Sequence, residues 1–226
     1  MKPVFIVLII AVVVVAVCVA AGCIMFKQKS ADPIPLTAKP KGKIAIVYYS
    51  QSKVRNTALI AKWIQQNVGG DLLELEMVKP YPEPYGETLK AASKDVSADR
   101  HPPLKSIPDL SGYDIVFLGS PIWYGTYAPP VATFLDAEKL TGKTVVPFCT
   151  HGGGGEGRYF VDLKKACPEA KFQHGLVIRG SNQIERRIGV GVSSHHTEND
   201  VITWLNSLFQ PIDAIQNMQN KGEQQK

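Results

Sequence analysis

Hydroxyl and amide side chains are concentrated in a short segment, Ser50 to Thr57, that precedes a predicted helix. Such a segment suits a phosphate, because the N–H groups and positive dipole end of a helix N-terminus attract anions and hydroxyls add donors. An ordinary N-cap, with Asn56 or Thr57 satisfying the first helical turn, explains the same composition. The segment is neither a Walker A loop nor a GxGxxG dinucleotide loop. Its candidate binding residues are Ser50, Gln51, Ser52, Arg55, Asn56 and Thr57.

Two large aromatic residues, Trp123 and Tyr124, are adjacent in the predicted loop from Gly119 to Pro130. Leaving both in water is costly, so they either pack on the domain or cover a flat, conjugated ligand. Gly125 tolerates positive φ and would let the neighbouring peptide change orientation beside such a ligand. The candidate binding residues of this segment are Pro121, Ile122, Trp123, Tyr124 and Gly125.

Glycines dominate a third segment, Thr150 to Arg158, and let the backbone approach a ligand closely. Its candidate binding residues are Thr150, His151, Gly152 and Gly153. The HGGG sequence is similar to the oxyanion loop of some esterases, but those enzymes also need a GxSxG nucleophile elbow, which this chain lacks. We predict no metal site, because adjacent histidines such as His195 and His196 point in divergent directions and no acidic or cysteine cluster surrounds them.

Apolar runs and helical periodicity place these segments in an alternating pattern of strands and helices. Strands are predicted at residues 44–49, 72–75, 115–118, 144–148 and 175–178. Helices are predicted at residues 57–68, 87–95, 131–137, 159–167 and 199–209. This alternation implies right-handed crossovers and a mainly parallel, doubly wound α/β sheet. Each of the three unusual segments follows a strand, and ligands bind outside the carboxyl ends of the strands in such a sheet.

Three stretches of the chain resemble the flavodoxin family, in a similarity that runs from about residue 43 to about residue 209. They are Val47-Tyr48-Tyr49-Ser50 with Asn56-Thr57, Tyr113-Asp114 leading to Gly119–Gly125, and Phe148–Gly153. The resemblance implies a five-stranded parallel sheet of order 2-1-3-4-5 and noncovalently bound FMN. It implies that Ser50, Ser52, Asn56 and Thr57 hold the phosphate. It also implies that Trp123 or Tyr124 flanks the isoalloxazine ring, with the glycine segment beside its pyrimidine edge.

The first segment departs from the family pattern. That pattern is usually Ser/Thr-x-Thr-Gly-Asn-Thr, whereas here Lys53, Val54 and Arg55 stand in place of one glycine. Two interpretations follow: the basic pair strengthens phosphate binding, or the longer loop distorts the amides that would receive the phosphate.

The N-terminal segment predicts a membrane anchor. Residues 3–26 contain no charged side chain, and a helix of that length rises about 36 Å, enough to cross a hydrocarbon core of about 30 Å. Ala20–Cys23 also resembles a lipobox, which would make the segment a cleaved lipoprotein signal. The lysines that follow favour an uncleaved helix with the domain on the cytoplasmic face. We therefore expect an anchor (1–26), a linker (27–42), a flavodoxin-like domain (43–210) and a polar, disordered tail (211–226).

Charge and motifs leave three functions open. The formal charge is +5, but three of the lysines lie in or beside the anchor, so no basic face for nucleic acid is indicated. The first function is an electron-transfer protein that passes electrons from FMN to a redox partner. The second is an FMN-dependent NAD(P)H oxidoreductase with a quinone-like acceptor. The third is a non-redox binding module that has lost FMN.

Overall fold

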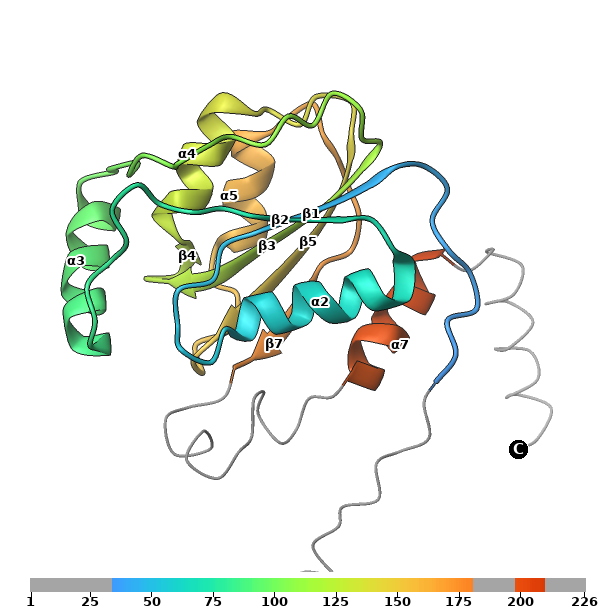
Figure 1. Cartoon of the computed structure of the whole chain (residues 1–226), viewed down its shortest axis with the longest axis horizontal. Helices are drawn as coiled ribbons and strands as arrows, with labels where there is room; N and C mark the ends of the chain where they lie inside the picture. The colour runs from blue at the N-terminus through green and yellow to red at the C-terminus, as the bar shows by residue number, and fades with distance from the viewer. Residues whose placement is uncertain (1–33, 181–197, 210–226) are drawn as a thin grey trace, which may run out of the picture. The chain divides into compact units, whose positions relative to one another are not determined.

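The computed structural model of the chain describes residues 34–180 and 198–209. Over these residues one largely parallel sheet lies between two layers of helices (Figure 1). Helices α2 (Asn56–Val68) and α7 (Glu198–Phe209) cover one face, and α4 (Pro129–Ala137) and α5 (Tyr159–Ala166) cover the other. Helix α3 (Tyr85–Ser97) contacts α4 at the side of the domain. The predicted α/β alternation is confirmed.

Strand β1 (Ile44–Tyr48) is an interior strand of the sheet and is buried along its whole length. Ala45 and Val47 face the α4 and α5 layer, whereas Ile44 and Ile46 face the α2 and α7 layer. Because alternate side chains of a strand point to opposite faces, a strand covered on both faces must be apolar at every position. This is why its sequence is an unbroken apolar run. Its parallel neighbours are β2 (Asp71–Glu74) and β3 (Ile115–Trp123).

Within the described residues the sheet has seven strands rather than the five predicted, in the order β2-β1-β3-β5-β6, with β4 beside β3 and β7 beside β5. The outer edge of β5 (Thr144–His151) is divided between two short strands. β6 (Lys171–Phe172) pairs with its beginning and β7 (Leu176–Arg179) with its end. Pro147 of β5 lies between these two stretches, and proline has no N–H to donate to a ladder. The predicted order 2-1-3-4-5 is corrected here because one edge position is taken by two strands.

The segment predicted as a loop after the third strand forms a β-hairpin instead. β3 continues to Trp123 and pairs antiparallel with β4 (Thr126–Tyr127). Tyr124 has a φ of 52° and Gly125 a φ of 82°. Positive φ at both central residues is what a two-residue type I′ turn requires, and this turn matches the right-handed twist of the paired strands. The aromatic pair is therefore carried on a defined hairpin.

Part of the predicted linker is attached to the domain. The side-chain oxygen of Asn206 in α7 accepts hydrogen bonds from the backbone N–H of Thr37 at 2.8 Å and from its hydroxyl at 2.9 Å. The amide nitrogen of Asn206 donates to the Pro35 carbonyl at 3.1 Å. Leu36, between them, packs against the core on the α2 and α7 side.

Replacing Asn206 with alanine is expected to release this attached stretch. The substitution leaves the Thr37 N–H without its acceptor, which costs about 1–2 kcal/mol in the free energy of unfolding. Denaturant unfolding measures the loss, and limited proteolysis between residues 34 and 42 measures the release. Ser207→Ala is the matched control, because that hydroxyl donates to the Trp204 carbonyl within the same helix. Equal effects of the two substitutions would contradict the prediction.

The predicted anchor (1–26), the start of the linker, the adjacent histidines and the tail (211–226) lie outside the described residues. Within residues 34–180 and 198–209 there is no helix with the length and apolar character needed to cross a membrane.

Candidate functional site

The carboxyl ends of β1, β3 and β5 lie side by side. Tyr48 pairs with Gly119 and Gly119 pairs with Phe148, so the segments that follow these strands emerge at one edge of the sheet. This is the edge at which ligands bind in open α/β sheets. The structure therefore brings the three predicted binding segments together.

Direct contacts join these segments. The hydroxyls of Thr57 and Thr150 are 2.9 Å apart, and both residues are buried. The backbone N–H of Arg158 donates to the Gly125 carbonyl at 2.6 Å and ties the glycine segment to the hairpin. The Asp162 carboxylate of α5 strengthens this tie, because it accepts from the Thr126 hydroxyl at 2.7 Å and from Arg158 Nε at 3.3 Å.

Helix α2 begins within the first segment. Its N-cap residue is Arg55, which makes no side-chain capping hydrogen bond, so neither Asn56 nor Thr57 stands at the N-cap position that the alternative interpretation gave them. The buried Ser50 hydroxyl lies 3.4 Å from the backbone nitrogen of Ala58 in that turn. A Cβ at Gly180, just after β7, would lie 2.3 Å from the Asn56 amide nitrogen, so a larger residue there would displace the Asn56 amide. The first turn remains suited to an anion.

Gln51 and Arg55, two of the predicted binding residues, are engaged with the protein. The side-chain oxygen of Gln51 accepts from the Tyr49 hydroxyl at 2.8 Å, and its nitrogen donates to the Tyr81 carbonyl at 3.2 Å. The Arg55 guanidinium donates to the Ser50 carbonyl at 2.7 Å and forms an ion pair with Glu74. Both side chains are therefore held by contacts within the protein.

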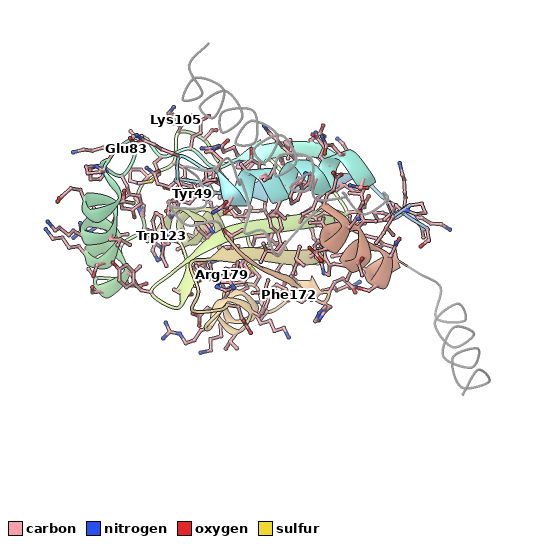
Figure 2. The ribbon with its side chains drawn as sticks, turned by 90° about the horizontal axis from the view of Figure 1, so that it is seen from below. Tyr49, Glu83, Lys105, Trp123, Phe172 and Arg179 are labelled. Carbon is pink, nitrogen blue, oxygen red and sulfur yellow. The ribbon has the colours of Figure 1, made fainter. Side chains whose placement is uncertain are left out.

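Trp123 belongs to an aromatic cluster. Its ring packs edge-to-face against Tyr49, with centroids 5.8 Å apart, and against Tyr81, with centroids 5.2 Å apart. Figure 2 shows Trp123 and Tyr49 next to each other between α3 and the strands. Burial raises the pKa of both tyrosine hydroxyls, and the Asp95 carboxylate that accepts from Tyr81 at 2.8 Å raises that pKa further. The cluster is neutral and apolar at physiological pH.

Tyr124 differs from Trp123, because it lies at the exposed tip of the hairpin. Its side chain reaches α3, where the hydroxyl donates to the Leu89 carbonyl at 2.7 Å. The two adjacent aromatics therefore have different surroundings, one packed on the domain and one in solvent.

His151 organises the glycine segment. Its Nδ1 accepts hydrogen bonds from the backbone N–H groups of Gly153 and Gly155, both at 3.0 Å. These two backbone N–H groups are therefore engaged within the segment itself. Gly157, with a φ of 57°, lies against the hairpin, where a Cβ would come within 2.3 Å of the Gly125 carbonyl oxygen.

The sequence analysis missed Glu74, Tyr81 and Asp162, which fix the candidate binding residues in place. Glu74 is the last residue of the second strand, so it also lies at the carboxyl edge of the sheet. Its place near the binding segments could therefore have been predicted from the strand pattern. Tyr81 lies in a proline-rich stretch with no periodicity, and Asp162 lies on a helix. Nothing local in the sequence marks either of them.

A groove of about 690 Å³ lies at the outer edge of the sheet between α5 and α7. Pro147, Phe160 and Trp204 line it, beside the break between β6 and β7. Glu156 is the one residue that it shares with the three binding segments. The groove is thus a different feature from the carboxyl edge of the sheet.

Cys149 and Cys167 are buried free thiols, and we expect both to be inert in the folded protein. Burial raises the pKa of Cys149 to about 12 and that of Cys167 to about 11. At pH 8 the thiolate fraction of Cys149 is then on the order of 10⁻⁴, and the thiolate is the reactive form. A thiol reagent should label neither cysteine before unfolding and both afterwards, in a Cys18→Ser/Cys23→Ser variant. Rapid labelling of the native protein would contradict this.

The fold and the joined segments define a doubly wound α/β domain of the flavodoxin-like class. A family profile described as flavodoxin matches residues 43–188, more than half of the chain. The chain belongs to the flavodoxin family.

Solved structures with the same fold include three bacterial proteins. A protein of Bacteroides eggerthii, assigned as a flavoprotein, has 28% sequence identity and a TM-score of 0.60, over 74% of this chain and 98% of that one. A second, from Bacteroides uniformis and also assigned as a flavoprotein, has 26% identity and a TM-score of 0.56, over 65% and 97% of the two chains. A flavoprotein of Lactobacillus acidophilus has 24% identity and a TM-score of 0.52, over 65% and 97%.

Proposed function

We propose that the domain binds FMN noncovalently at the carboxyl edge of the sheet and serves in electron transfer. The observation that carries the proposal is the start of α2, which lies among hydroxyl side chains where β1 ends and whose N-cap residue makes no side-chain capping bond, in a chain of the flavodoxin family. The structure of the Lactobacillus acidophilus flavoprotein is that of its complex with FMN, which supports the choice of cofactor.

The residues at the start of α2 fit the phosphate of FMN. Helix N-termini attract anions through their N–H groups and the positive end of the dipole. Ser50, Ser52 and Thr57 would add hydroxyl donors, and Asn56 an amide. The two basic side chains of the segment itself are paired with acids, Arg55 with Glu74 and Lys53 with Glu83 at 3.2 Å. The phosphate would therefore be held mainly by neutral donors.

The ring system of FMN would lie between the hairpin and the glycine segment. Trp123 and Tyr124 offer aromatic surface on the hairpin, and Thr150, Gly152 and Gly153 offer backbone on the other side. Bound FMN would supply the redox chemistry by accepting and donating electrons, while the protein binds and orients it. The Arg158–Gly125 hydrogen bond would keep the hairpin and the glycine segment at a fixed separation.

Titration with FMN tests the proposal. The full chain in detergent should bind FMN with 1:1 stoichiometry, followed by the change in flavin fluorescence. A chain that neither contains nor takes up FMN would support the non-redox binding module instead. NAD(P)H oxidation by the FMN-loaded protein, with and without a quinone, separates a carrier from an oxidoreductase. Rapid turnover without an added reductase would reject the carrier.

The proposal also includes attachment to a membrane through residues 3–26, on the basis of their uncharged, apolar sequence. Fractionation of cells that express the chain with and without residues 1–26 tests it. Only the longer form should sediment with membranes, and recovery of both forms in the soluble fraction would contradict it. Labelling with a membrane-impermeant reagent would identify the side that carries the domain.

A further inference from the structure

We infer that Arg55 is a positioning residue that holds the phosphate segment in its binding shape and does not itself contact the phosphate. The inference deepens the proposed function and rests on it, because the segment concerned is the one assigned to the FMN phosphate.

The backbone of Arg55 adopts a conformation that arginine rarely takes. Its φ is 59°, in the left-handed region, where a residue with a Cβ is less favourable than glycine. The backbone N–H of Arg55 donates to the Ser52 carbonyl at 2.9 Å and lies 3.2 Å from the Ser52 hydroxyl, which closes a tight turn just before α2. A residue other than glycine that keeps this unfavourable backbone conformation must make contacts that offset it.

Those contacts come from the guanidinium, which bridges the segment to the neighbouring strand. One nitrogen donates to the Ser50 carbonyl at 2.7 Å, and another forms the ion pair with Glu74 at the end of β2. The other Glu74 oxygen accepts from the Tyr48 hydroxyl at 3.2 Å. Ser50 at the start of the segment and Arg55 near its end are therefore fastened to each other and to two adjacent strands.

The geometry separates Arg55 from Lys53, the other basic residue of the segment. The Lys53–Glu83 pair is exposed on both sides and bridges no backbone group of the segment. Exposed pairs of this kind contribute little to stability. Arginine can bridge two acceptors at once through its planar fork, whereas lysine carries a point charge. The function of Arg55 thus depends on its two acceptors as well as on its charge.

The test compares the affinities for FMN and riboflavin, which lacks the phosphate, among variants of the full chain. We expect Arg55→Gly, Arg55→Lys and Glu74→Ala each to weaken FMN binding by about tenfold or more. This is the size of effect that the loss of one charge-assisted hydrogen bond produces. Glycine tolerates the positive φ, so a loss of affinity in Arg55→Gly would not come from backbone strain. Lysine keeps the charge, so a loss of affinity in Arg55→Lys would not come from a missing charge. Riboflavin affinity should stay unchanged, and the Arg55→Gly/Glu74→Ala double variant should bind FMN no more weakly than the single variants. Lys53→Ala should bind FMN like the wild type.

Several outcomes would overturn the inference. If Glu74→Ala leaves FMN affinity unchanged or raises it, Arg55 acts on the phosphate directly. If riboflavin affinity falls in parallel with FMN affinity, Arg55 has only a general role in folding. If Lys53→Ala weakens FMN binding as much as Arg55→Gly does, the charge of the segment is what matters. Failure of the wild type to bind FMN would overturn the proposed function itself, and this inference with it.

Discussion

Replacing Gly157 with alanine is expected to separate the glycine segment from the hairpin and to weaken FMN binding by about ten- to a hundredfold, or roughly 1.4–2.8 kcal/mol. A Cβ at this position would lie 2.3 Å from the Gly125 carbonyl oxygen and 2.8 Å from its carbonyl carbon. Both are backbone atoms, so no change of rotamer relieves the overlap. The Arg158–Gly125 hydrogen bond next to it would break as the segments part.

Gly155 provides a matched control for this substitution. Its φ is 73°, close to the 57° of Gly157, but nothing lies within 4 Å of a Cβ there. Gly155→Ala should therefore cost only about 1 kcal/mol from the left-handed backbone. Gly157→Ala should cost about 1–3 kcal/mol more, from overpacking. Thermal unfolding and FMN titration measure both effects, and equal losses in the two variants would show that the contact with the hairpin does not matter.

Replacing Trp123 with alanine is expected to reduce both the stability of the domain and its affinity for FMN. The ring packs against both Tyr49 and Tyr81. Removing a fully buried aromatic side chain costs about 3–5 kcal/mol in the free energy of unfolding. Trp123 is only half-buried, so we expect a loss of about 2–3 kcal/mol. A ring that stacks on FMN would contribute about 1–3 kcal/mol to binding, by analogy with base–aromatic stacking.

Tyr124→Ala separates these two effects. Tyr124 is exposed and makes one hydrogen bond to α3, so its removal should change the free energy of unfolding by less than about 1 kcal/mol. If Tyr124 is the residue that covers the flavin, its removal will weaken FMN binding without a loss of stability. Denaturant unfolding of the two variants shows whether Trp123, unlike Tyr124, stabilises the domain by packing. An unchanged stability of Trp123→Ala would refute the role of the aromatic cluster.

The sequence predicted the parallel core of the fold because that part depends on local patterns. The run Ile44–Tyr49 is apolar at every position, as a strand covered on both faces must be. The hairpin was missed because Trp123-Tyr124-Gly125 is also typical of a loop, and only the pairing of β3 with β4 distinguishes the two. The break between β6 and β7 was missed for a similar reason, since the effect of Pro147 acts across strands.

The location of the candidate site was predictable from topology, whereas its internal contacts were not. The three segments follow strands whose carboxyl ends must meet at one edge of a parallel sheet. Gln51 and Arg55 were expected at a ligand, and each has one partner that is distant in the sequence, Tyr81 for Gln51 and Glu74 for Arg55. Hydrogen bonds between residues 19 to 30 positions apart, such as those to Glu74 and Tyr81, depend on the tertiary fold.

The absorption spectrum of the full chain as purified shows whether the domain holds FMN. We expect a yellow protein with the visible bands of a flavin, from which denaturation releases FMN in a ratio of one per chain. A colourless protein that remains colourless after incubation with excess FMN would contradict this expectation.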